Sequence, residues 1–315
     1  MSAPLLFALK ALLAALVLAF VVQVVDPEAA LAAAREAWMA PLLLALALVP
    51  ANVSLEAYRW WRLVTHLAPD VRFRSALGAI LGGYPLGLLT PGRVGEIAGR
   101  AALLRALPAG QSAALTVAEK VATLAAILVG GLIAVGHLLL TSAAPSPLWV
   151  PTVVFTALWT AVLLLAVLHP SAARAFLGAI LPFAPVRRAL GAFDAIPTRE
   201  AVALLALSFG RYLIFASQFV LLVLAFAPQA AVGAVASGVA LVLFAKSAVH
   251  SVTLGDLGVR EGAAVFFLGS AGVSEAAALN ASLAIFGFNL LLPALVGVPF
   301  LLRLRLSRSS APAIS

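Results

Sequence analysis

The sequence contains no cysteine and little charge, and each shortage excludes a class of protein. Without cysteine, the 315-residue chain cannot form a disulfide, a thiolate metal site or a thiol nucleophile. The four histidines are scattered and give no His-x-x-x-His spacing, so we expect no metal centre and no cofactor. Charged residues make up 10% of the chain, whereas an ordinary soluble domain has about 25%. The sequence therefore does not encode an ordinary soluble domain.

The chain is instead predicted to be an all-α, polytopic membrane protein. It is 64% hydrophobic, with a mean hydropathy of +1.13, and no barrel-type alternation is present, so helices are the expected spans. Six apolar runs have the length of about 20 residues that a bilayer crossing needs. They are Leu5 to Val25, Met39 to Tyr58, Ala113 to Leu140, Leu148 to Leu168, Ala201 to Phe226 and Ala276 to Leu302. The first run contains Lys10 and no small-residue cleavage site, which predicts a membrane helix rather than a signal peptide.

The net charge of +8 is interpreted as a signal of orientation rather than a nucleic-acid site. The loops at 141–147 and 227–232 carry no charge, and 26–36 is net acidic, so these are expected outside the cell. The basic clusters, with both termini, are expected on the cytoplasmic side of the inner (plasma) membrane. These clusters are Arg59, Arg62, Arg72 and Arg74; Arg174, Arg187, Arg188 and Arg199; and Arg303, Arg305 and Arg308.

Two charged breaks interrupt apolar segments that do not fit as simple spans. Ala76 to Thr90 is short for a crossing and leads into Pro91-Gly92-Arg93-Val94-Gly95-Glu96, while Ala231 to Leu254 leads into a break that ends with Arg260 and Glu261. If each of these segments enters the membrane and returns to the same side, every later loop lies on the side of the membrane that its charge predicts. We therefore predict two re-entrant hairpins, the first entering from the cytoplasm and the second from outside. Their turns are assigned to Pro91, Gly92, Gly95, Gly255 and Gly258.

These hairpins divide a single transmembrane domain, 1–315, into inverted halves at 1–147 and 148–306. Each half is predicted as helix, helix, re-entrant hairpin, helix, which gives about six full spans and two broken hairpins. Inverted repeats are associated with transporters that hold their substrate near the membrane midplane.

The charged breaks also carry a family resemblance. The segment Pro91 to Glu96, followed by Arg100 and Leu104, resembles the lysylphosphatidylglycerol synthase transmembrane family, flippase-like domains found alone or fused to an aminoacyl-phosphatidylglycerol synthase. Gly258 to Glu261 and Ala118-Glu119-Lys120 extend the resemblance over most of the chain, although Lys120 stands where the family usually has arginine. Because the chain ends just after the last span, the resemblance implies lipid movement and not lipid aminoacylation, and we expect no enzymatic activity.

A lipid headgroup crossing the bilayer needs polar partners, because a bare phosphate in hydrocarbon is costly. Guanidinium groups bind phosphate through paired hydrogen bonds, and carboxylates could pair with them, accept a cationic headgroup or exchange protons. The alternative is that buried arginines and glutamates only neutralise each other so that broken helices can pack. The candidate substrate-binding residues are Arg93, Glu96, Arg100, Glu119, Lys120, Arg211, Lys246, Arg260 and Glu261.

Other polar and aromatic residues have simpler interpretations. Arg211 could instead extend its charge toward the membrane surface, and Asn280 and Asn289 are expected to bond neighbouring helices. The glycines Gly82, Gly83 and Gly87 are expected to allow close helix packing. Four tryptophans are predicted to anchor the protein at the membrane interfaces. These are Trp38, Trp60, Trp61 and Trp149.

The predicted function is a flippase-like transporter of an anionic or aminoacylated phospholipid or a polyprenyl-phosphate lipid. The alternative is a membrane-embedded hydrolase or transferase acting on a lipid phosphate or pyrophosphate, although the serine-rich, glycine-histidine motif of undecaprenyl-pyrophosphate phosphatases is not found. A third possibility is a partner that positions lipid for a lipid-modifying enzyme. Membrane lipids are the expected partners in every case, and nucleic acid is not.

Overall fold

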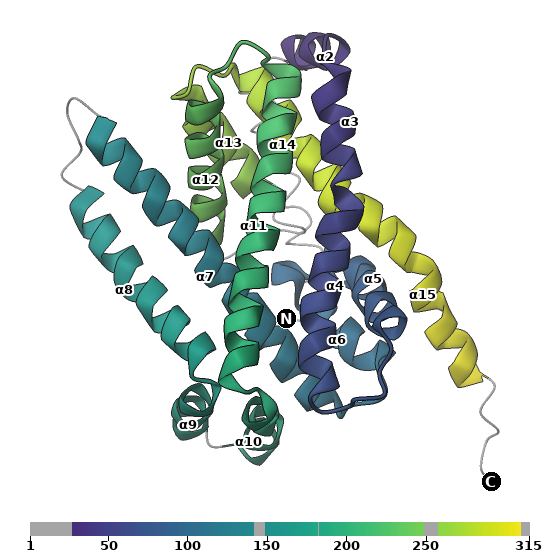
Figure 1. Ribbon diagram of the computed structural model, residues 1–315. Helices are drawn as coiled ribbons and strands as arrows, with labels where there is room; N and C mark the ends of the chain where they lie inside the picture. The colour runs from purple at the N-terminus through teal and green to yellow at the C-terminus, as the bar shows by residue number, and fades with distance from the viewer. Residues whose placement is uncertain (1–26, 142–148, 182, 249–257, 310–315) are drawn as a thin grey trace, which may run out of the picture.

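The computed structural model describes residues 27–141, 149–181, 183–248 and 258–309, and over these ranges the chain is helical with no strand (Figure 1). The elements are α2 Pro27–Arg35, α3 Met39–Ala47, α4 Val49–Thr65, α5 Phe73–Leu89, η1 Pro91–Arg93, α6 Val94–Leu103, α7 Ala109–Thr141, α8 Trp149–Leu168, α9 Pro170–Ile180, α10 Ala184–Leu190, η2 Gly191–Ala195, α11 Thr198–Phe226, α12 Val232–Ala248, α13 Val259–Gly269, α14 Glu275–Phe286, η4 Gly287–Leu291 and α15 Leu292–Ser309.

Five helical segments in the described residues are long and apolar enough to cross a membrane. They are Met39–Thr65, Ala109–Leu140, Val150–Leu168, Thr198–Phe226 and Glu275–Leu302. Five of the six predicted spans are thus present as helices, and the sixth, Leu5 to Val25, lies outside the described residues. The all-α prediction is confirmed for the described part of the chain.

The short apolar helices occur as two packed pairs. Helix α5 contacts α6, and α12 contacts α13. Figure 1 shows α5 and α6 near the end of the molecule that holds α9 and α10, whereas α12 and α13 lie toward the end that holds α2. The predicted turn at Gly255 lies outside the described residues.

Glycine lets α5 and α6 approach each other closely. A Cβ added to Gly87 would lie 2.5 Å from the Cγ atom of Glu96, and one added to Gly82 would lie 2.4 Å from Leu103. A Cβ on Gly95, in the facing helix, would lie 2.1 Å from the carbonyl oxygen of Leu86. Real side chains do not tolerate such distances, so the predicted close packing of this glycine run is confirmed.

The connection between α5 and α6 is a sharp turn in left-handed backbone. Gly92 has φ 60°, and Arg93 has φ 57°, a conformation that costs energy for a residue with a side chain. The Thr90 hydroxyl donates to the carbonyl of Leu86 at 2.8 Å and accepts the amide of Gly95 at 2.7 Å. Thr90 therefore links the end of α5 to the start of α6, and its hydrogen bonds fix where α6 begins.

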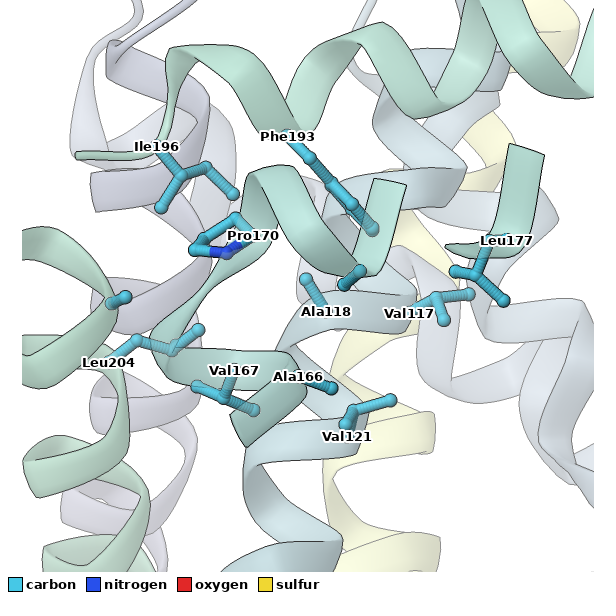
Figure 2. A pocket seen from close by; sticks show the side chains of 12 residues that line it. Val117, Ala118, Val121, Ala166, Val167, Pro170, Leu177, Phe193, Ile196 and Leu204 are labelled. Atoms are coloured by element: carbon cyan, nitrogen blue, oxygen red, sulfur yellow. The ribbon is translucent and has the colours of Figure 1, made fainter. Parts of the chain in front are cut away.

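Two short helices, α9 and α10, follow α8, and Pro170 and Pro185 each stand in the first turn of one of them. Helix α9 has no buried residue and exposes Phe176. Figure 2 shows a pocket at the base of α9, and every side chain labelled there is apolar. Its volume is about 80 Å³, and its apolar lining offers no partner to a polar headgroup.

Two predictions about the end of α4 are wrong. Trp60, predicted at the membrane interface, is fully buried and donates its indole N–H to Thr116 at 3.1 Å. Arg59, predicted in a cytoplasmic loop, is also buried, because α4 continues to Thr65 and turns both side chains toward α7. Trp38 is exposed, as an interfacial anchor requires, and the side chain of Trp149 lies outside the described part.

Replacing Gly297 with alanine should destabilise the contact between α15 and α5. A Cβ at this position would lie 1.9 Å from the carbonyl oxygen of Leu81, so the two helices would have to separate. We expect a loss of about 1–3 kcal/mol in the free energy of unfolding, measured in detergent. Gly136→Ala is the control, because nothing lies within 4 Å of its added Cβ. Equal stability of the two variants would contradict this packing.

Candidate functional site

Eight ionisable side chains from four helices and the η1 turn meet inside the protein. Five of them were predicted as site residues in the first half of the chain, and one, Arg211, in the second half. Glu56 and Arg59 were not. The ion cluster consists of Glu56 and Arg59 on α4, Arg93 in η1, Glu96 and Arg100 on α6, Glu119 and Lys120 on α7 and Arg211 on α11.

Arg100 lies at the centre of the ion cluster. One of its terminal nitrogens contacts Glu56, and the other donates to Glu119 at 2.5 Å. The Arg100 side chain is 1% exposed. Because an uncompensated buried charge is costly, two carboxylates from different helices are needed to hold it. The pairs thereby fix α6 against both α4 and α7.

Glu56 and Arg59 extend the cluster along α4. Glu56 accepts hydrogen bonds from the Tyr84 hydroxyl and from Arg211, each at 2.7 Å. Arg59 pairs with Glu119 and donates to Ser208 at 2.6 Å. Arg211 is therefore held by a buried carboxylate, so the alternative that it extends to the membrane surface is wrong.

Glu96 pairs with two bases at the edge of the cluster. The Lys120 Nζ atom lies 2.6 Å from one of its carboxylate oxygens, and Arg93 contacts the other. Arg93 also stacks over the Tyr84 ring, with 5.5 Å from Cζ to the centroid. Glu119 and Lys120 are adjacent in sequence but bond to different partners, because adjacent helical residues point in different directions.

A cavity of about 230 Å³ opens beside the ion cluster. Four basic side chains line it: Arg93, Lys120, Arg211 and Lys246. Glu56 and Glu119 contribute the acidic part of the lining, and Ile127, Tyr212, Phe215 and Leu243 contribute apolar walls. We call this space the cationic cavity. Lys120 is the most accessible of the cluster's bases, with 38% of its side chain exposed.

The charge balance of the ion cluster is positive. It contains three carboxylates and five bases, a formal net charge of +2 among the described residues that form it. Lys246 adds a sixth base on the cavity wall. The Nε–H of Arg211 has no hydrogen-bond partner among the described residues. The arrangement can therefore receive an anionic group.

The residues of the second break bond to one another and to α14. Arg260 pairs with Glu261, and both contact the hydroxyl of Ser282 on α14. The other oxygen of Glu261 accepts the amide of Gly258, whose φ of 93° suits glycine. Among the described residues, no hydrogen bond or ion pair of Arg260 or Glu261 reaches the ion cluster. The structure therefore brings seven of the nine predicted residues to the cavity or the ion cluster and keeps these two apart.

Arg59 was missed because the span was predicted to end at Tyr58, which placed Arg59 in a cytoplasmic loop, whereas Glu56 and Tyr84 lie inside predicted apolar segments and were not assigned a role. The signal was present in the spacing of Asn52, Glu56 and Arg59, which are four and three residues apart and so share one helical face. All three are buried. A polar stripe of this kind on an apolar helix indicates a face turned toward other polar groups.

The asparagines bond neighbouring helices, as predicted. Asn52 donates to Asn289 at 2.5 Å, and Asn280 donates to the carbonyl of Ala30 at 2.7 Å. Asn289 lies in η4, a π-helical turn between α14 and α15. These bonds attach the last span to α4 and α2.

Comparison with known families gave one match. The family model described as Lysylphosphatidylglycerol synthase TM region matches residues 7–297. Searches of curated proteins and of solved structures gave no match.

Replacing Glu119 with glutamine should destabilise the protein strongly. The change removes the carboxylate that pairs with the buried Arg59 and one of the two carboxylates that hold Arg100, which keeps Glu56. Breaking a buried ion pair typically costs about 3–5 kcal/mol. We expect a large fall in the unfolding temperature in detergent. Glu275→Gln, at an exposed position in the first turn of α14, is the matched control and should change little. A Glu119 variant as stable as this control would show that the cluster does not hold α4, α6 and α7 together.

Proposed function

We propose that this chain, which belongs to the lysylphosphatidylglycerol synthase transmembrane family, moves a membrane lipid with a phosphate headgroup across the bilayer. The observation that carries the proposal is the positive cationic cavity inside a multi-pass membrane protein. Intramembrane ionisable groups are expensive, and they usually mark a pathway or a binding site.

A phosphate matches the chemistry of this cavity. Arginine binds phosphate through two parallel hydrogen bonds, and lysine supplies a mobile point charge. Arg211 and Lys120 reach the cavity from helices on different sides, so a headgroup between them would have partners in more than one direction. Pairing alone explains the cluster less well, because among its described residues three carboxylates stand against five bases.

The positive balance also favours an anionic headgroup over a cationic one. A phosphatidylglycerol or polyprenyl-phosphate lipid is net negative, whereas a lysylated phospholipid carries additional positive charge. Close like charges repel strongly in a site of low dielectric constant. An anionic lipid is therefore the proposed substrate.

The two helix pairs support a route across the membrane. We propose that α5 with α6 and α12 with α13 are re-entrant hairpins of two inverted halves, opening toward the cytoplasm and the outside respectively. Their placement toward opposite ends of the molecule supports this (Figure 1). Backbone turns at membrane depth are tolerated where they line a cavity, and Arg93 in η1 lines the cationic cavity. With cytoplasmic termini in the inner membrane, such halves could expose the cavity alternately.

We propose transport without chemical conversion of the lipid. The headgroup needs only binding and release, which cationic side chains supply. Arg260 and Glu261 are proposed to shape the second hairpin or to receive the headgroup later on its path. A lipid-modifying enzyme is the proposed protein partner.

The transport proposal predicts that removing cavity charge slows lipid movement. In vesicles containing the reconstituted protein and a fluorescent phosphatidylglycerol, Lys120→Gln and Lys246→Gln should each reduce the rate about tenfold, because a charge-assisted bond to the phosphate is lost. Arg199→Gln is the control, since Arg199 is exposed at the start of α11.

The same vesicles test the preference for charge. Wild-type protein should move phosphatidylglycerol faster than lysyl-phosphatidylglycerol. If both lysine variants moved lipid at the wild-type rate, the cationic cavity would not be the site. If purified protein released inorganic phosphate from a polyprenyl pyrophosphate, a hydrolase would be the better assignment.

A further inference from the structure

A second, larger cavity adjoins the cationic cavity and has a different character. It has a volume of about 680 Å³ and is lined by α7, α8 and α12. We call it the α8 groove. Its lining residues are Leu124, Leu128, Pro151, Thr152, Phe155, Thr156, Trp159, Leu163, Phe244, Ser247 and Ala248.

The α8 groove lies at the depth of the membrane spans. Six of its residues belong to the span Val150–Leu168, and two belong to the span Ala109–Leu140. Helix α8 is the least buried of the five spans. Figure 1 shows α8 at one side of the helical bundle, next to α7. The groove is thus bordered by a helix with a largely exposed apolar face, which in a bilayer would meet lipid chains.

The lining of the groove suits a flexible hydrocarbon chain. The ring centroids of Phe155 and Trp159 lie 6.3 Å apart, one turn from each other on α8. The lining is mainly apolar, and the hydroxyl of Ser247 donates to the carbonyl of Phe244 at 2.7 Å within α12. The groove therefore presents apolar surface without requiring a polar ligand.

The groove and the cationic cavity share part of their walls. Leu124 and Ser247 line both, and Lys246, on the cavity wall, directly precedes Ser247 in α12. One space is cationic and the other apolar, so together they match a molecule with an anionic head and an apolar tail. A soluble anion would match only the first, and a neutral hydrocarbon only the second.

We propose that the α8 groove binds an acyl chain of an anionic lipid while its phosphate lies in the cationic cavity. The lipid thereby enters sideways from the bilayer, between α8 and α12, rather than from the aqueous ends. The proposal rests on the proposed function for its ligand, because it concerns the same headgroup site. It adds the tail-binding surface and the side of the protein from which the lipid arrives.

Photolabelling of wild-type protein tests this placement without relying on transport. The full chain is reconstituted in phosphatidylcholine vesicles that contain phosphatidylglycerol with a diazirine on its acyl chain. After irradiation, we expect labels on peptides that contain Leu124, Phe155 or Phe244, identified by mass spectrometry. Lys120→Gln with Lys246→Gln should reduce this labelling about a hundredfold, because the headgroup loses two charge-assisted contacts.

Two results of this labelling would overturn the proposal. One is equal labelling of the groove by diazirine-bearing phosphatidylcholine, which would identify ordinary boundary lipid. The other is labelling concentrated at Leu158 and Val162, which are exposed on α8 and do not line the groove. Labelling of the groove without transport would uphold the binding site and overturn only the transport function.

A pair of tryptophan substitutions tests the groove by filling it. Leu124→Trp adds bulk at the wall that both cavities share, and Val162→Trp adds the same bulk to the exposed face of α8. The Leu124 variant should lose photolabelling of the groove about tenfold, as expected for an overfilled site, while the Val162 variant should keep it. Equal labelling of both would overturn the proposal even if the wild-type protein moves lipid.

Discussion

The compensation of the buried Arg100 charge is the constraint on which the described structure depends most. Its guanidinium group is held by Glu56 of α4 and Glu119 of α7, so the short helix α6 cannot leave either span without exposing a charge to an apolar interior. The two carboxylates in turn hold Arg59 and Arg211. A buried ion network often stabilises a protein no better than well-packed apolar residues would, and we propose that its presence in a membrane protein reflects ligand binding.

Two features shape this site: the close packing of the α5 and α6 backbones, and the net positive charge of the ion cluster. Glycines on α5 and α6 bring the two short helices into contact, and the left-handed turn at Gly92 and Arg93 places a cation beside Tyr84 and the cavity. The carboxylates fix the inner arginines, while Lys120 remains partly accessible. The protein can therefore keep its helices in place and still present positive charge to a ligand. In our proposal, the adjoining apolar groove binds the tail of the same ligand.

Much of this arrangement could be predicted from the sequence, since membrane spans and charged breaks are local patterns. The spans from Met39 onward, the glycine packing of α5 and the separate partners of Glu119 and Lys120 follow from helical spacing. Arg59 was missed because loop charge and buried charge look alike near the end of a span. The grouping of Arg211 with the first break, and of Arg260 with Glu261 and Ser282, depends on how distant helices pack, which no local pattern records.

Mass spectrometry of the lipid that remains bound after mild detergent purification tests the central claim most directly. We expect a lipid with a net negative phosphate headgroup bound to wild-type protein at about one molecule per chain, as one site requires, and lost from the variant that lacks the charges of Lys120 and Lys246. Retention of zwitterionic or lysylated lipid in preference to anionic lipid would contradict the account. So would an anionic lipid that remains equally bound when both lysines are neutralised.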